Sequence, residues 1–133
     1  MAARYLLDTN ICIYFMKGLF DLEQKVRTVG EDHCFISEIT LAELKFGVEN
    51  SNRPEQNRVT LEKFLSGIQI LPIINTLDVY AKEKSRLQKA GSIIDDFDLL
   101  IGAAAITYNL ILVTNNSRHF TRLSNLSLEN WAN

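Results

Sequence analysis

The sequence predicts an α/β fold, a three-layer sandwich in which helices flank a central, mostly parallel sheet of four to five strands. Short apolar runs with strand-like composition alternate with longer segments whose apolar residues recur every three or four positions. Strands separated by helices of this length pair in parallel. Neither a low-complexity linker nor an internal repeat divides the chain, so residues 1–133 are expected to form a single domain.

The strand-like runs are short and strongly apolar, as expected for strands covered on both faces. They are residues 4–8, 34–37, 69–74 and 110–114, with a weaker candidate at 126–128. In parallel α/β sheets, ligands bind beyond the carboxyl ends of the strands. Polar residues that follow these runs are therefore the first candidates for a functional site.

The helix-like segments carry recognisable start and stop residues. Ser37 is a candidate N-cap, Pro54 suits a first helical turn, and Gly67 and Gly91 follow segments that end there. Thr76 begins a further segment with a cap-like pattern. The predicted helices are 10–17, 21–29, 39–50, 54 to about 66, 76–90, and one from 95 or 96 to 108 that is apolar on nearly every face.

Composition limits the kinds of partner and the compartment. The chain has 14 basic and 16 acidic residues, so binding to nucleic acid requires a local basic patch or a bridging metal. Cys12 and Cys34 form no CxxC pair, which favours a reducing compartment over a structural zinc site. No apolar stretch is long enough to cross a bilayer. We expect a soluble, cytoplasmic protein.

Three acids lie on apolar elements, where unpaired charges are uncommon. Asp8 ends the first strand-like run, Glu43 lies in the helix after the second, and Asp98 lies in the first turn of the apolar helix. The Thr-Asn-Asn sequence at residues 114–116 ends the last clear strand at the same edge of the sheet. Such oxygen ligands suit Mg²⁺ or Mn²⁺. A metal held there would support hydrolysis of a phosphodiester by water.

Each acid also has a purely structural interpretation. Asp8 is a good N-cap for the helix that follows it, and Glu43 can reach solvent from a partly exposed face. Asp95, Asp96 and Asp98 are all favoured by the dipole at a helix N-terminus. Capping explains one or two of these acids, but acids that converge repel one another unless a cation is present.

The chain resembles the PIN-domain ribonucleases and, within them, the VapC-type toxins of bacterial toxin-antitoxin modules. Four blocks in this order carry the resemblance, which covers almost the whole chain. They are LLDTN at 6–10, ISEITLAEL at 36–44, DLLIGAAA at 98–105 and LVTNNSRHF at 112–120.

The resemblance implies roles for individual residues. Asp8, Glu43 and Asp98 match the acidic triad that binds Mg²⁺ or Mn²⁺, and Asp96 lies where some members have a further acid. The family's fourth acid is replaced by Asn116, which puts a second metal in doubt. Residues expected to hold carboxylates and water by hydrogen bonds are Thr9, Asn10, Thr114, Asn115 and Asn116.

The same resemblance implies an RNA substrate, a homodimer and a complex with a VapB-type antitoxin. The Asn-Asn pair also resembles enzymes that cleave initiator tRNA, which makes tRNA the expected substrate. Arg118, Arg122 and Lys45 are candidates for a basic rim that holds RNA phosphates. His33 and His119 are assigned structural or surface roles.

Two other classes of protein share some of these features. A phosphoacceptor domain would need an acceptor Asp after the third strand and a Lys after the last, and residues 73–75 and 114–116 offer neither. The other alternative is a non-catalytic or weakly catalytic module that binds an antitoxin or RNA partner through its acidic pocket. Cleavage of RNA by the purified protein would distinguish this alternative from a nuclease.

Overall fold

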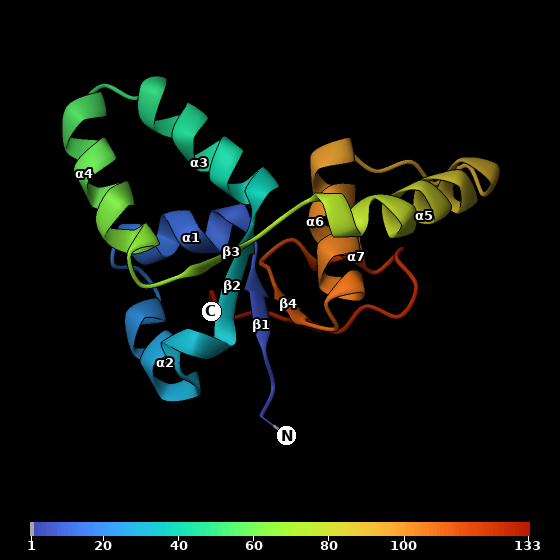
Figure 1. Cartoon of the computed structure of the whole chain (residues 1–133), viewed down its shortest axis with the longest axis horizontal. Coiled ribbons are helices and arrows are strands. Elements are labelled where there is room, and N and C mark those ends of the chain that lie inside the picture. Colours follow the sequence, from blue (N-terminus) through green and yellow to red (C-terminus); the bar gives the residue numbers. More distant parts are fainter. Residues whose placement is uncertain (1) are drawn as a thin grey trace.

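The computed structural model describes residues 2–133 and contains one five-stranded sheet in the order β3-β2-β1-β4-β5 (Figure 1). Every neighbouring pair of strands is parallel, so the predicted α/β class is confirmed and the sheet is parallel throughout. The strands are β1 (Tyr5–Leu7), β2 (Cys34–Ser37), β3 (Gln69–Leu71), β4 (Ile111–Val113) and β5 (Leu128–Glu129).

Helices cover both faces of this sheet. The α-helices are α1 (Thr9–Met16), α2 (Leu22–Val29), α3 (Glu38–Glu49), α4 (Pro54–Leu65), α5 (Leu77–Lys89), α6 (Asp96–Thr107) and α7 (Ser117–Phe120). Two 3₁₀ turns, η1 (Glu31–His33) and η2 (Ile74–Thr76), precede β2 and α5. Ser37 caps α3 by accepting a hydrogen bond from the Thr40 amide, and Pro54 occupies the first turn of α4, as predicted.

Neighbouring residues of each central strand pack into different cores, because successive side chains of a strand point to opposite faces. In β1, Leu6 joins a core built with α5, α6 and α7, whereas Leu7 joins a core built with α1, α2, α3 and α4. Leu112 and Val113 divide between the two cores in the same way. The three-layer arrangement in Figure 1 follows from this alternation of buried side chains.

Some predicted boundaries are wrong. The third strand ends at Leu71, not at residue 74, because Pro72 has no amide hydrogen for a ladder bond. The last strand, Leu128–Glu129, begins two residues later and ends one residue later than expected. Thr76 makes no capping bond to α5, and its hydroxyl donates instead to the Ile73 carbonyl. Helix α7 was not among the predicted helices.

The order of the strands places a topological switch between β1 and β4. The chain moves outward from β1 through β2 to β3, and then returns to the other side of β1 to form β4 and β5. The Asp8 amide continues this pairing by donating a 2.9 Å hydrogen bond to the Val113 carbonyl. Such a switch opens a crevice at the carboxyl ends of the two strands. Asp8 and Thr114 lie at this point.

Within residues 2–133, no helix combines the length and the apolar character needed to cross a membrane.

Candidate metal and nuclease site

Asp8 is the most deeply buried acid of the site, with 5% of its surface exposed. It caps α1, since its Oδ1 accepts from the Thr9 amide at 2.8 Å, and its Oδ2 accepts from the Thr114 hydroxyl at 2.8 Å. Burial raises the pKa of Asp8, and the nearby charges of Asp98 and Glu43 raise it further against those two hydrogen bonds. The capping bond therefore explains the position of one Asp8 oxygen. Within residues 2–133, the buried negative charge of Asp8 has no cationic partner.

Glu43 reaches the same place from α3. Its Oε1 accepts a 2.6 Å hydrogen bond from the hydroxyl of Thr9, the residue whose amide binds Asp8. The Thr9 hydroxyl also lies 3.2 Å from the hydroxyl of Thr40, which is fully buried. Thr9 therefore connects the carboxylates of Asp8 and Glu43, as expected for a residue that holds the acids in place.

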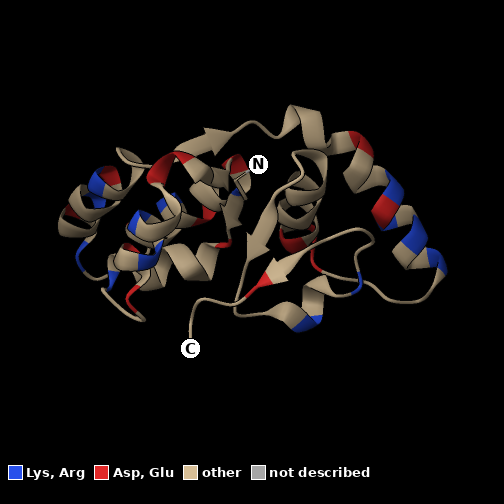
Figure 2. Ribbon diagram, turned by 90° about the horizontal axis from the view of Figure 1, so that it is seen from below, with Lys and Arg blue, Asp and Glu red and all other residues tan. Residues whose placement is uncertain are grey.

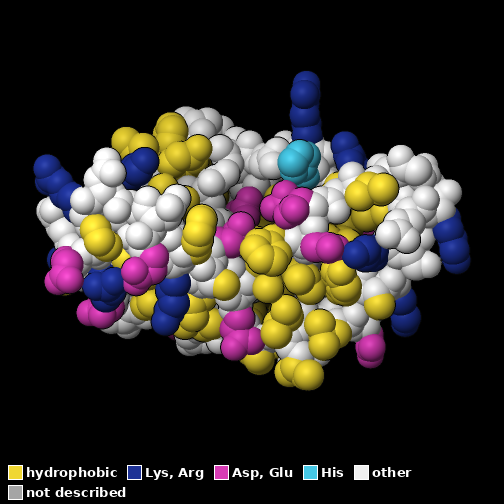
Figure 3. All heavy atoms as spheres, turned by 90° about the horizontal axis from the view of Figure 1, so that it is seen from above, with side chains coloured by type: hydrophobic (Ala, Val, Ile, Leu, Met, Phe, Trp, Pro, Cys, Tyr) yellow, Lys and Arg dark blue, Asp and Glu magenta, His cyan; other side chains and the backbone are white. Residues whose placement is uncertain are grey.

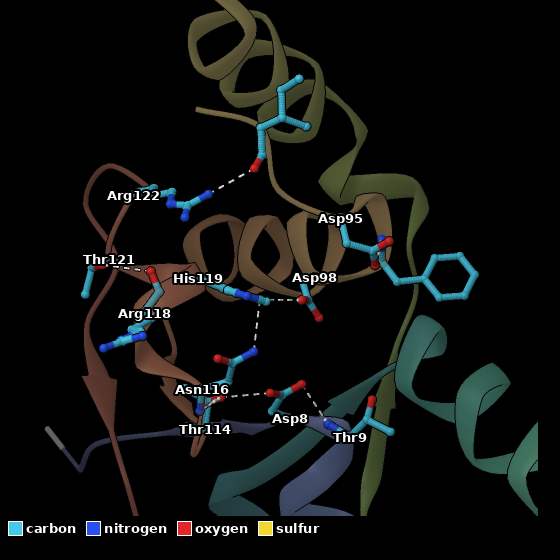
Figure 4. Close-up of polar contacts among 12 residues, drawn as sticks. Asp8, Thr9, Asp95, Asp98, Thr114, Asn116, Arg118, His119, Thr121 and Arg122 are labelled. Atoms are coloured by element: carbon cyan, nitrogen blue, oxygen red, sulfur yellow. Dashed lines mark hydrogen bonds and ion pairs between the residues drawn. The ribbon is translucent and has the colours of Figure 1, made fainter. Parts of the chain in front are cut away.

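Asp98 approaches from the first turn of α6 (Figure 4). Its Oδ2 lies 3.1 Å from Nδ1 of His119, and its side chain is 24% exposed. The amide nitrogen of the Asn116 side chain lies 2.9 Å from the same Nδ1. The backbone amide of Asn116 donates to the Thr114 hydroxyl at 3.0 Å, so Asn116 lies between Asp98 and Asp8.

The fold thus brings Asp8, Glu43 and Asp98 to one edge of the sheet, as the sequence predicted. Figure 3, which views the molecule from above, shows acidic side chains gathered near the middle with a histidine beside them. Within residues 2–133, no three acidic, His or Cys side chains are close enough to form a ready-made metal cluster. The charges of Asp98 and Glu43 nevertheless act on Asp8, and each of the three carboxylates is held by a neighbouring hydrogen bond.

The chemistry of this set of side chains fits a hard divalent cation. All three candidate ligands are carboxylates, and the pKa of Asp8 is raised first by burial and then by the negative charges of Asp98 and Glu43. Within residues 2–133, neither Lys nor Arg forms an ion pair with Asp8, Glu43 or Asp98.

Several predicted site residues lie elsewhere. The Asp96 carboxylate accepts from Lys84 and Tyr80 of α5, both at 2.9 Å, and these bonds lower the pKa of Asp96. Asn115 donates to the Tyr14 hydroxyl rather than to a carboxylate. Asn10 is exposed and makes no side-chain hydrogen bond within residues 2–133. The structure therefore does not bring these three side chains to the carboxylates.

The basic residues lie around the acids and not among them. In Figure 4, the guanidinium group of Arg118 points away from Asp8 and Asp98, and that of Arg122 points toward its hydrogen-bond partner in another loop. Arg122 donates to the Ile93 carbonyl at 2.9 Å, which ties two loops together, whereas Arg118 and Lys45 are exposed. Figure 2 shows Lys and Arg concentrated on helices at both ends of the long axis, including α5. Contact of Arg118, Arg122 and Lys45 with RNA phosphates stays a prediction.

Sequence reasoning missed two participants. His119 was assigned a structural or surface role and not a place in the site, yet it contacts Asp98, because helix α7 turns the chain back toward α6. Thr40 was not selected, although it lies three residues before Glu43, where one helical turn brings the two side chains to the same face. The position of the polar residue Thr40, one helical turn from the candidate ligand Glu43, could have identified it as part of the site.

The fold and the converging carboxylates define a class: a parallel α/β domain with an acidic site at the switch point of its sheet. Residues 5–126 match the profile of the family described as PIN domain. The chain belongs to the PIN-domain family, and within it to the VapC group, which confirms the resemblance seen in the sequence.

The relatives align with this chain over nearly their full length. "Ribonuclease VapC2" of Rickettsia felis is 41% identical over 135 residues, covering 96% of this chain and 97% of the relative. "tRNA(fMet)-specific endonuclease VapC" of Shigella flexneri is 33% identical, covering 97% and 98%. The crystal structure of VapBC2 from Rickettsia felis, bound to a DNA fragment from their promoter, superposes with a TM-score of 0.89 at 39% identity, covering 96% and 98%.

Proposed function

We propose that this protein is a metal-dependent endoribonuclease that acts as the toxin of a type II toxin-antitoxin module. The observation that carries the proposal is the convergence of Asp8, Glu43 and Asp98, where burial raises the pKa of the Asp8 carboxyl and the charges of the other two acids raise it further. A buried carboxylate such as that of Asp8, with two further acids beside it, destabilises the fold unless a cation joins it. The VapC relatives named as ribonucleases support this activity.

Asp8, Glu43 and Asp98 would hold Mg²⁺ or Mn²⁺. When bound, such an ion lowers the pKa of a water molecule and neutralises charge on a phosphate. Thr114 and Thr9 fix the two oxygens of Asp8. This preorganisation removes part of the cost of arranging ligands during the reaction.

Glu43 is our candidate for the group that removes a proton from the attacking water. Thr9 holds its Oε1, and within residues 2–133 its Oε2 makes no hydrogen bond and is free to accept. The water oxygen forms a bond to phosphorus, the bond from phosphorus to the leaving ribose oxygen breaks, and that oxygen takes a proton from solvent. The chain is thereby cut into two fragments.

Transfer RNA is the proposed substrate, and initiator tRNA is the first to test. This choice rests on the relative named as a tRNA(fMet)-specific endonuclease, which aligns over 97% of this chain. Cleavage of initiator tRNA would inhibit translation, as expected of a toxin. A VapB-type antitoxin is the proposed partner, because the similar crystal structure contains a VapBC pair. A homodimer, implied by the family resemblance, is part of the same proposal.

The test is cleavage of a total tRNA pool by the purified protein with Mg²⁺ or Mn²⁺, with and without EDTA. Asp8→Ala removes a buried ligand, and Asp32→Ala removes an exposed acid in η1 as a matched control. We expect discrete fragments from the wild type and from Asp32→Ala only when metal is present. Cleavage that persists in EDTA or in Asp8→Ala would contradict the proposal.

The uncompensated charge at Asp8 also favours a second candidate function, a non-catalytic or weakly catalytic module. A basic side chain of an antitoxin would neutralise the acids as a cation does. In that case, folded wild-type protein would cut neither tRNA nor rRNA with metal present, yet would still bind its partner. Loss of partner binding in Asp8→Ala, with no cleavage by the wild type, would establish this alternative.

A further inference from the structure

A continuous run of hydrogen-bonding groups connects Asp98 to Asp8 across the site (Figure 4). Asp98 contacts His119 at 3.1 Å, His119 contacts the Asn116 side chain at 2.9 Å, and the Asn116 amide donates to Thr114 at 3.0 Å. Thr114 donates in turn to Asp8 at 2.8 Å. The two acids come from α6 and from the end of β1, which share no backbone hydrogen bond. The run, which includes the backbone amide of Asn116, is therefore a polar link between them through His119, Asn116 and Thr114.

The chemistry of the groups determines where the hydrogens lie. A carboxylate only accepts, so Nδ1 of His119 must carry the hydrogen that faces Asp98. The same N–H cannot accept from the Asn116 amide. Turning that amide by 180° leaves its shape unchanged and places its oxygen against Nδ1. His119 then donates from one nitrogen to two acceptors, Asp98 and Asn116.

We propose that His119 is a positioning residue that, together with Asn116, holds Asp98 in the orientation needed to bind the divalent cation. This inference rests on the proposed metal-dependent function. His119 fixes Oδ2 of Asp98, and within residues 2–133 the other oxygen, Oδ1, makes no hydrogen bond. A carboxylate held by one oxygen presents the other to a ligand with little loss of rotational freedom.

Packing does not explain the place of His119. Its side chain is 45% exposed and belongs to neither buried cluster. The next residue, Phe120, is fully buried and anchors α7 in the core. Substitution of His119 should therefore leave the fold intact, so an effect on metal binding can be assigned to the lost contact with Asp98.

The experiment exploits the different positions of the donors in Asn and Gln. The side-chain nitrogen of Asn overlies Nδ1 of a histidine, whereas that of Gln overlies Nε2. His119→Asn keeps the donor to Asp98, while His119→Gln and His119→Ala remove it. His33→Gln is the matched control, because His33 bonds the Val29 carbonyl in a turn away from the site. Binding of Mn²⁺ to the EDTA-treated protein is measured by isothermal titration calorimetry.

We expect His119→Gln and His119→Ala to weaken Mn²⁺ binding by about 10- to 100-fold, and His119→Asn and His33→Gln to remain close to the wild type. In tRNA cleavage, kcat should fall in the first two variants while KM stays unchanged, because His119 is not assigned an RNA contact. Affinities of His119→Gln and His119→Ala within about twofold of the wild type would overturn the proposal. So would a His119→Asn variant that binds no better than His119→Gln.

The failures of the two proposals are distinguishable. A folded wild type that neither binds Mn²⁺ nor cleaves RNA refutes the metal-dependent function, whereas a wild type that does both, with unaffected variants, refutes only the role of His119. If the variants unfold, ¹⁵N NMR of the wild-type imidazole tests the contact directly. A hydrogen on Nδ1 is expected, and a ring with bare Nδ1 and hydrogen on Nε2 would overturn the proposal.

Discussion

The hydroxyl of Thr114 donates a 2.8 Å hydrogen bond to Oδ2 of Asp8, and both residues are at least 95% buried. The two residues are 106 positions apart in sequence, yet they follow adjacent strands. The bond therefore joins the carboxyl ends of β4 and β1, at the point where the chain reverses the direction in which it adds strands to the sheet. It also supplies one of the two donors that favour the ionised form of Asp8.

Thr114→Val should destabilise the protein by about 1–3 kcal/mol at neutral pH. The substitution keeps the shape of the side chain but leaves a buried carboxylate oxygen without its donor. It also raises the pKa of Asp8 further, so the loss should shrink as the pH falls and Asp8 becomes protonated. Urea unfolding at several pH values measures the effect. Thr28→Val, at an exposed hydroxyl on α2, should change stability by less than about 0.5 kcal/mol.

Asp8→Asn should stabilise the metal-free protein at neutral pH while abolishing cleavage. Because the pKa of Asp8 is raised in the folded state, the folded protein binds more protons than the unfolded chain between the two pKa values. Ionisation of Asp8 therefore costs stability as the pH rises through the folded pKa. We expect a gain of about 0.5–2 kcal/mol at pH 7 that disappears toward the unfolded pKa. A gain that grows as the pH falls would contradict this assignment.

Mn²⁺ should raise the melting temperature of EDTA-treated protein, because an ion that binds only the folded state stabilises it by mass action. At a concentration 100 times the dissociation constant, the stabilisation is about 2.7 kcal/mol. Asp8→Asn and Asp98→Asn remove charges from the site and should lose most of this shift. Thermal denaturation with and without Mn²⁺ measures it. An equal shift in both variants and the wild type would place the ion elsewhere.

Sequence patterns predicted the class of the fold because they depend on local chemistry. The apolar runs at Leu6–Leu7 and Leu112–Val113 indicate strands covered on both sides, and Asp8 and Thr114 end these two runs. Neighbouring parallel strands place such residues at one edge, so their proximity could be predicted without coordinates.

The contacts of individual side chains could not be predicted in the same way. His119 reaches Asp98 only because α7 packs Phe120 against α6, a tertiary contact with no local pattern. Asp96 lies two residues before the candidate ligand Asp98 in the same helical turn, but its side chain points toward Lys84 on α5. Side chains two residues apart on a helix point in different directions, so the direction of the Asp98 side chain does not predict that of Asp96.

Two helical glycines should respond in opposite ways to replacement by alanine. A Cβ at Gly102 of α6 would lie 2.3 Å from Leu123 Cδ1 and 3.4 Å from Phe120 Cδ1, whereas one at Gly47 of α3 meets nothing within 4 Å. Gly102→Ala should cost about 1–3 kcal/mol through overpacking. Gly47→Ala should gain up to about 1 kcal/mol from helix propensity. Urea denaturation of both variants measures the contrast, and equal effects would contradict the close packing around Gly102.

Arg118→Ala should weaken RNA binding without affecting the chemical step. Arg118 is exposed at the start of α7 and its guanidinium points away from the carboxylates, so it is placed to contact a phosphate distant from the cut (Figure 4). We expect a higher KM, an unchanged kcat, and a slope of log affinity against log salt that is smaller by about 1. Arg27→Ala, on the exposed face of α2, is the matched control and should behave as the wild type. A fall in kcat with constant KM would instead place Arg118 at the reacting phosphate.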